Sequence, residues 1–243
     1  MDAYEKNIAA QYEALGRFVE AFEMMVHEAR NCCISMLSYD LTDRKRKLIA
    51  IPFHHQQLSA LPLFELFRAI LMEVISDSKY QADYDLTKSD VDRFSGVLGA
   101  VSGKYQELLN KRNSLLHGTW FVGYRGTHDP DAESFHISKY KTSAVGLVPV
   151  ELPTTVAELN DLTIRCEETR NWISVVHGCL PSSKVNLKIG ECFKKECGTW
   201  ERIWPPQDKD EAKFSVKVHQ SDTGQSTSIF IVARTNTGNT GNT

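Results

Sequence analysis

Apolar residues recur every three or four positions through most of residues 1–180, which is the spacing of an amphipathic α-helix. Helices of this kind bury their apolar sides against one another when short connections join them. The pattern therefore predicts a mainly α fold, an antiparallel four-helix up-and-down bundle. The four predicted helices cover residues 3–37, 56–79, 87–116 and 155–177.

Local signals support the predicted helix starts. Thr87 and Asp90 form a capping-box-like start, and Thr155 and Glu158 form a capping box, in which each side chain bonds to the backbone N–H of the other residue. Pro62 is tolerated only in the first turn of a helix, so the second helix is expected to begin close to it.

The segments between the helices are predicted as a connection and a hairpin. Residues 38–55 contain mixed charges and a proline, so we expect a connection there, with a short extended piece at residues 48–51. Aromatic and β-branched residues at 119–125 and 134–141 flank a turn-rich stretch. This arrangement predicts a β-hairpin inserted at about residues 119–141.

The helical pattern ends near residue 180. Trp200 and Trp204 lie in a stretch that we expect to be packed but irregular, and apolar runs at 214–218 and 228–232 predict a second hairpin. Repeats of Asn, Thr and Gly at the C-terminus are typical of disorder. The expected organisation is a helical domain, a small α/β or β appendage and a disordered tail, at residues 1–180, 181–234 and 235–243.

The 243-residue chain is 42% hydrophobic and 24% charged, which is typical of a soluble globular protein. No apolar run approaches the roughly 18–20 residues of a membrane span, so we expect a cytoplasmic protein without a membrane partner. The net charge of −3 argues against a protein that coats nucleic acid non-specifically. A local basic patch remains compatible with this charge. Its candidates are residues 44–47, which are also typical of a solvated loop, and Lys111, Arg112 and Arg125.

Six cysteines in a chain of this length do not form a disulfide-dense scaffold, so we expect reduced thiols. His177, Cys179, Cys192 and Cys197 are residues of the types that bind zinc. Their paired spacings, H-x-C and C-x4-C, are looser than the usual C-x2-C. We therefore predict no metal and no cofactor.

Candidate chemistry gathers at residues 111–120 (KRNSLLHGTW), where the third helical pattern ends. At about 100° per residue, Asn113 and His117 lie about 40° apart around a helix, whereas Arg112 and His117 lie about 140° apart. Arginine offers a fork of donors to phosphate oxygens, histidine transfers a proton near neutral pH, and asparagine orients the imidazole or the substrate. The set lacks the carboxylates or thiolates that a metal needs, and it suits chemistry on a phosphate.

The same residues also have a purely structural interpretation. Basic groups in the last turn, followed by Gly118, end a helix favourably because cations stabilise the negative end of its dipole and glycine stops the helix. Arg112, however, falls on the inward-facing side of the apolar series. A guanidinium at such a position needs a groove, a carboxylate or a second subunit as its partner. This requirement favours a functional site over a purely structural helix end.

Residues 112–117 (RNSLLH) resemble the R-N-x-x-x-H form of the R-x(4–6)-H signature of the HEPN superfamily, and the His-Gly-x-Trp continuation is similar to that of many members. Over about residues 1–180, the resemblance implies an antiparallel helical bundle that dimerises and places two copies of the motif across a two-fold axis. For active members it implies metal-independent endoribonuclease activity. RNA and a second copy of the chain are therefore the expected partners.

The resemblance also implies roles for individual residues. The 2′-OH of RNA would attack the adjacent phosphorus and leave a 2′,3′-cyclic phosphate and a 5′-OH. His117 would act as general base or acid, Arg112 would stabilise charge on the phosphorane, and Asn113 would orient His117 or a phosphate oxygen. Lys111 and Arg125 are the expected RNA-binding residues.

Other functions stay open at this point. A non-catalytic HEPN-like scaffold or binding module for RNA, a nucleotide or a regulatory protein partner also fits an acidic chain. A toxin or defence subunit controlled by an antitoxin fits less well, since Gly118-Thr119 replaces the familiar H-x-Tyr continuation. The hairpin after the motif either brings Tyr124, Arg125 or His128 to substrate or a partner subunit, or serves as a structural flap.

Overall fold

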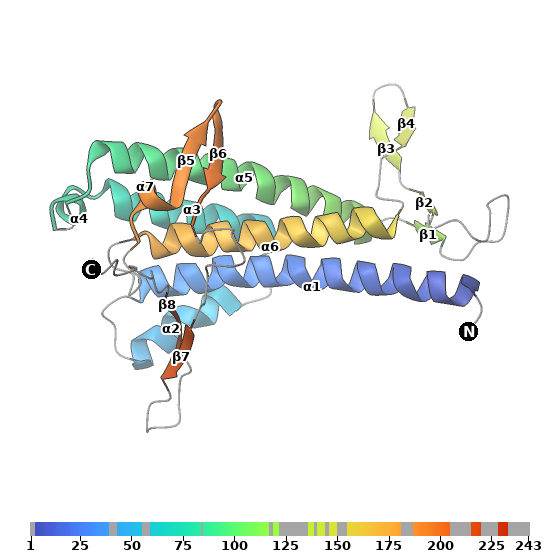
Figure 1. The fold of residues 1–243 in the computed structure, drawn as a ribbon, viewed down its shortest axis with the longest axis horizontal. Coiled ribbons are helices and arrows are strands. Elements are labelled where there is room, and N and C mark those ends of the chain that lie inside the picture. Colours follow the sequence, from blue (N-terminus) through green and yellow to red (C-terminus); the bar gives the residue numbers. More distant parts are fainter. Residues whose placement is uncertain are drawn as a thin grey trace, which may run out of the picture. The chain divides into compact units, whose positions relative to one another are not determined.

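The computed structural model divides the chain into two compact units, Met1–His177 and Gly178–Thr243. In its described parts the chain is mainly α-helical, with small two-stranded antiparallel sheets (Figure 1). The described residues are 3–38, 43–54, 59–83, 85–116, 119–121, 136–138, 140–143, 146–149, 155–180, 187–204, 215–219 and 228–232.

The long helices lie where the apolar spacing predicts them. The first predicted helix is confirmed over its whole length, and the second ends at Asp77, whose extended backbone separates two helices. Pro62 lies in the first turn of the second long helix, as predicted. The helices of the described residues are α1 (Ala3–Leu37), α2 (Asp43–His54), α3 (Ala60–Ser76), α4 (Ser78–Asp83), α5 (Lys88–Leu116), α6 (Val156–Gly178) and α7 (Ile189–Cys192).

Both predicted capping boxes are confirmed. The backbone N–H of Thr87 donates to Asp90 Oδ2 over 3.1 Å, and the N–H of Asp90 donates to Thr87 Oγ1 over 3.2 Å. At the start of α6, Thr155 N–H donates to Glu158 Oε2 over 3.0 Å, and Glu158 N–H donates to Thr155 Oγ1 over 3.2 Å. These bonds satisfy N–H groups that have no partner within the helix, so they fix where α5 and α6 begin.

The prediction of an extended piece at residues 48–51 is wrong, because this segment belongs to helix α2. Phe53 is buried, while Leu48 and Ile51 point to solvent with 60% and 63% of their surface exposed. The strand preference of the β-branched residues is therefore outweighed by the packing of one side of this helix, which contacts α1. In Figure 1, α2 leads the chain back, so that α1 and α3 run in the same direction. The four long helices consequently do not alternate in direction as predicted.

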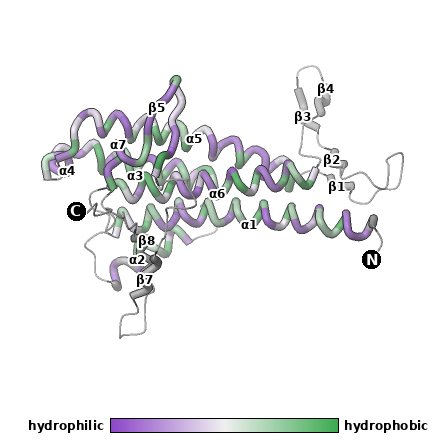
Figure 2. Tube along the Cα trace, viewed as in Figure 1, coloured by the Kyte–Doolittle hydropathy of each residue, from purple (hydrophilic) through white to green (hydrophobic). Residues whose placement is uncertain are grey.

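The core of the helical unit centres on aromatic residues from three helices. The fully buried ring of Tyr105 stacks on Phe64, with centroids 4.2 Å apart, and lies 6.4 Å from Phe22. The Tyr105 hydroxyl donates to the Ala60 carbonyl over 2.9 Å, so the one polar atom of this cluster is satisfied. Hydrophobic and hydrophilic residues are interspersed along α1 and α5, as Figure 2 shows. The cluster holds α1, α3 and α5 together.

Polar contacts join α6 to the same unit. Arg165 on α6 pairs with Glu107 on α5, and Lys104 on α5 lies 5.0 Å from the centroid of the Trp172 ring. Arg17 on α1 donates to Asn160 over 3.3 Å. The contacts of α6 therefore reach both α1 and α5.

Two small sheets lie between α5 and α6 in the sequence. Strands β1 (Thr119–Phe121) and β2 (His136–Ser138) pair antiparallel, which confirms the predicted hairpin. A further antiparallel pair, β3 (Tyr140–Ser143) and β4 (Gly146–Pro149), was not predicted. The turn residues between β1 and β2 lie outside the described residues.

The second unit contains a hairpin where an irregular segment was expected, and a further hairpin that was predicted. Strands β5 (Phe193–Glu196) and β6 (Thr199–Arg202) pair antiparallel around Cys197 and Gly198, whose φ angles of 48° and 85° are both positive. Two central residues with positive φ match the twist of the paired strands. The predicted second hairpin is confirmed as β7 (Ser215–His219) paired with β8 (Ser228–Val232). The predicted tail, 235–243, lies outside the described residues.

Among the described helices, none has both the length and the apolar character needed to cross a bilayer.

Candidate functional site

The predicted site residues lie on and beyond the last turns of α5. Arg112 and Asn113 are part-buried on this helix, and Lys111 precedes them, also part-buried. The structure describes α5 to Leu116, so His117 and Arg125 lie outside the described residues. The geometry of the site is therefore that of Arg112, Asn113 and the side chains around them.

Three contacts fix the guanidinium of Arg112. Its Nη2 lies 3.0 Å from Glu23 Oε1 on α1, and its Nη1 lies 3.4 Å from Asn113 Oδ1. The guanidinium carbon lies 5.6 Å from the centroid of the Phe22 ring, as a cation–π contact requires. The buried Nε atom has no hydrogen-bond partner. Arg112 thus crosses from α5 to α1 in a defined orientation.

The sequence-based expectation that Arg112 needs a partner is confirmed by the carboxylate of Glu23. The side chains of Arg112 and Glu23 remain 28% and 54% exposed, so solvent screens the pair. Exposed pairs of this kind contribute about 0–1 kcal/mol to stability. The contact with Glu23 therefore orients the guanidinium more than it stabilises the fold.

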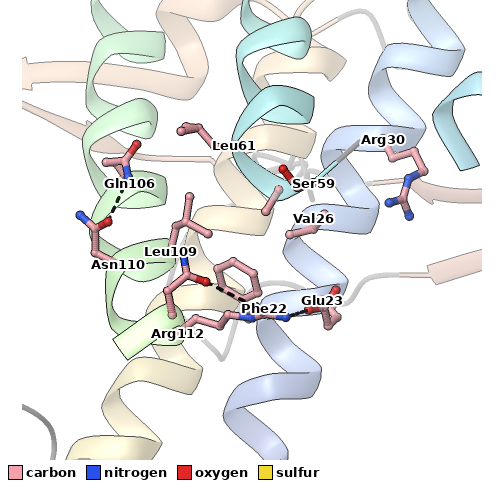
Figure 3. A pocket seen from close by; sticks show the side chains of 12 residues that line it. Phe22, Glu23, Val26, Arg30, Ser59, Leu61, Gln106, Leu109, Asn110 and Arg112 are labelled. Carbon is pink, nitrogen blue, oxygen red and sulfur yellow. Dashed lines mark hydrogen bonds and ion pairs between the residues drawn. The ribbon is translucent and has the colours of Figure 1, made fainter. Parts of the chain in front are cut away.

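Arg112 lies at the edge of a pocket of about 420 Å³ between α1, the start of α3 and α5 (Figure 3). The pocket forms because α1 and α5 each present residues three or four positions apart to the same space. Its wall is apolar at Val26, Leu61 and Leu109 and carries amide groups elsewhere. The lining residues are Phe22, Glu23, Val26, Arg30, Ser59, Ala60, Leu61, Gln106, Leu109, Asn110, Arg112 and Asn113.

The charged residues of the pocket favour an anionic ligand. Arg30 and Arg112 contribute two positive charges and Glu23 one negative charge, which leaves one net positive charge. Arg30 has no ion-pair or hydrogen-bond partner among the described residues, and its buried Nε is also unpaired. Arginine binds carboxylate and phosphate groups through its planar fork of donors.

The other predicted basic residues do not line this pocket. Arg44, Lys45 and Lys47 are exposed on α2, and Lys111 lies beside Arg112 without reaching the pocket wall. Any contact of these residues with RNA would therefore lie outside the pocket.

Of the residues weighed as zinc ligands, two are buried, one is part-buried and one is exposed. Cys179 and Cys192 are buried, and the S–H of Cys179 bonds to Cys192, which together with burial raises the pKa of Cys179. Cys197 is exposed in the turn between β5 and β6. Burial lowers the pKa of His177. Within the described ranges no three histidine, cysteine or acidic side chains gather in a way that would hold a metal ion.

Sequence reasoning missed Glu23, Arg30, Gln106 and Asn110. The partner of Arg112 is 89 positions away in the chain, and only the packing of α1 on α5 brings it close. Gln106, Asn110 and Asn113 did carry a signal, since amide residues at i, i+4 and i+7 form a polar stripe along one side of a helix. The last residue of that stripe, Asn113, is adjacent to Arg112 in the sequence.

Comparison of the chain with models of protein families, with curated proteins and with solved structures finds no match. The functional proposal therefore rests on the motif and on the residues of the pocket.

Proposed function

We propose that the chain is a metal-independent endoribonuclease of HEPN type that acts on RNA as a homodimer. The observation that carries the proposal is the setting of Arg112. Its guanidinium is oriented by Glu23, Asn113 and Phe22, yet 28% of the side chain remains exposed at the edge of a polar pocket. A positioned and accessible guanidinium is what stabilisation of a phosphorane needs.

In the proposed reaction, the 2′-oxygen of RNA forms a bond to the adjacent phosphorus while the bond from phosphorus to the 5′-oxygen breaks. His117 accepts the 2′-OH proton or donates a proton to the leaving oxygen. Arg112 stabilises the negative charge that develops on the phosphorane oxygens. Because Asn113 Oδ1 faces the Arg112 guanidinium, its proposed role is to orient Arg112.

The proposal includes a bundle of HEPN type, formed by α1, α3, α5 and α6, that dimerises through the end of α5. Two copies of His117 across the two-fold axis would then supply the base and the acid of one reaction. A toxin or defence role, with a regulatory protein that restrains cleavage, belongs to the same proposal.

The test uses the purified protein and a mixed pool of single-stranded and structured RNA in EDTA. We expect cleavage that leaves 2′,3′-cyclic phosphate ends and that is lost in His117→Ala and Arg112→Ala. Arg93→Ala, which removes an exposed arginine from the same helix, should cleave like the wild type. Circular dichroism would establish that all variants fold equally. Cleavage that persists in both motif variants would refute this site.

A second candidate function is a scaffold or binding module without catalysis. The observation in its favour is the Arg112–Glu23 ion pair, which joins α5 to α1 without any substrate. In that case Arg112→Ala would lower the thermal unfolding midpoint and change no RNA product. The ion pair is lost under either function, so the two functions differ in whether Arg112→Ala changes the RNA products.

A further inference from the structure

The pocket beside Arg112 has features that the proposed cleavage reaction does not use. Gln106 and Asn110 line it from α5, and Arg30 lines it from α1 (Figure 3). None of these three residues belongs to the R-N-x-x-x-H motif. A volume of about 420 Å³ lies within the range of roughly 300–1,000 Å³ that is usual for small-ligand pockets.

The amide groups of Gln106 and Asn110 bond to each other and keep further donors and acceptors that make no hydrogen bond among the described residues. Gln106 Nε2 donates to Asn110 Oδ1 over 3.2 Å. Among the described residues, no hydrogen bond occupies Gln106 Oε1 or Asn110 Nδ2. Adjacent amide donors and acceptors match the edges of nucleobases, and a good bidentate contact of this kind contributes about 1–3 kcal/mol of discrimination between bases.

The rest of the pocket suits the other parts of a nucleotide. Val26, Leu61 and Leu109 give an apolar wall for the flat surface of a base. Arg112 contacts Glu23 of α1, and Arg30 lies seven residues further along α1, so the two arginines line the pocket at separate points. Two cations at separate points suit a strand that carries repeated phosphates.

We infer that this pocket receives one unstacked base of single-stranded RNA, next to the phosphate at Arg112, and that Gln106 and Asn110 contact the edge of the base. The inference rests on the proposed function and adds a basis for specificity to it. Sequence-specific recognition of RNA generally uses unpaired bases, since their hydrogen-bonding edges are accessible. Gln106 and Asn110 are thereby specificity-determining residues, separate from the catalytic motif.

The test measures binding of four homopolymeric oligoribonucleotides, of A, C, G and U, each with 2′-O-methyl groups that prevent cleavage. Fluorescence anisotropy gives their affinities for the wild type, Asn110→Leu, Gln106→Met and the control Asn171→Leu. Asn110 and Asn171 are both exposed on helices, and Asn171 does not line the pocket, so the same substitution separates the pocket from general surface effects.

We expect the wild type to prefer one or two of the four oligomers. Asn110→Leu should weaken binding of the preferred oligomers about 5- to 100-fold and leave the others unchanged, and Gln106→Met should act in the same direction. Asn171→Leu should bind like the wild type. Equal binding of all four by the wild type, or an equal loss of all four in Asn110→Leu, would overturn the inference.

Cleavage of the matching unmodified oligomers distinguishes this inference from the proposed function. Selective binding that depends on Asn110, without cleavage, would support the pocket and contradict the nuclease. Cleavage that depends on Arg112 and His117, without base preference, would support the nuclease and contradict the pocket.

Discussion

At the scale of single residues, the side chain that decides the character of the site is Glu23. Its carboxylate holds Arg112 from a different helix and occupies donors that a phosphate would need. The need for a partner could be predicted, because the apolar spacing put Arg112 on an inward-facing position. The identity of that partner could not, since it depends on how α1 packs on α5.

We therefore predict that Glu23→Gln binds RNA more tightly than the wild type. Removal of the competing carboxylate leaves the guanidinium free for phosphate, so the affinity for an uncleavable oligoribonucleotide should rise about two- to tenfold at low salt. The free energy of unfolding should fall by less than about 1 kcal/mol because the pair is exposed. The measurements are fluorescence anisotropy and urea denaturation.

Glu13→Gln is the matched control for this prediction. Glu13 also pairs with an arginine, Arg17, on α1, but it does not line the pocket. Its substitution should leave RNA affinity unchanged within about twofold, since its charge is exposed and screened. An equal rise of affinity in both variants would show a general charge effect and would contradict the role given to Glu23.

A second prediction concerns the dependence of stability on pH that arises from Tyr105. Burial, and then the carboxylate of Glu23, raise the pKa of Tyr105 above its ordinary value near 10. The folded protein therefore holds this proton more tightly than the unfolded chain. The resulting stability is complete below about pH 10 and is lost as the pH rises through the pKa of the folded state.

Tyr105→Phe should remove that alkaline dependence. The variant also loses the hydrogen bond to the Ala60 carbonyl, so its free energy of unfolding at pH 7 should fall by about 1 kcal/mol or somewhat more. Urea denaturation between pH 7 and 11 gives both quantities. Replacement of the exposed Tyr12 by Phe serves as the control, and an equal change of slope in that variant would exclude Tyr105 as the cause.

At the scale of elements, helix starts could be predicted where the residues that fix them are close together in the sequence. The Thr87 and Thr155 capping boxes could be predicted because both partners lie within four residues of each other. Helix α2 could not, since Ile49 and Ile51 favour a strand and the burial of Phe53 depends on packing against other helices. The β5–β6 turn was missed because Cys-Gly is a rare version of the Asn-Gly signal.

Alanine is expected to have opposite effects on stability at two glycines, Gly198 in the β5–β6 turn and Gly99 in α5. Gly198 has a φ of 85°, so Gly198→Ala should destabilise the hairpin by about 1–2 kcal/mol. Gly99 lies inside α5 with open space around it, and Gly99→Ala should stabilise that helix by up to about 1 kcal/mol. Amide hydrogen exchange in β5–β6 and in α5 measures each effect locally. Slower exchange in the hairpin of Gly198→Ala would contradict the positive φ.

At the scale of the whole molecule, the helical unit Met1–His177 contains the motif and the pocket. The mainly α character of this unit followed from the repeat of apolar residues. The direction of α3 could not be predicted, because it depends on helix α2, which lies in a segment with the composition of a connection. The proposed dimerisation also depends on surfaces that no local pattern specifies.

The proposed dimer predicts that cleavage depends on protein concentration. If two copies of His117 supply the base and the acid, the rate per mole of chain should fall on dilution in parallel with the dimer fraction. Sedimentation velocity measures that fraction, and a fluorogenic RNA measures the rate. A constant rate per mole through complete dissociation would contradict a shared site.

The return of the chain through α2 has a consequence for the order of folding. Helices α3 and α5 are antiparallel and are joined by a shorter connection than the one that joins α1 to α3. Closing the shorter loop costs less chain entropy, so the α3–α5 pair should form first, around Phe64 and Tyr105. Helix α1 then docks after the rate-limiting step. Substitutions between α3 and α5 would therefore slow folding, whereas substitutions on α1 would mainly speed unfolding.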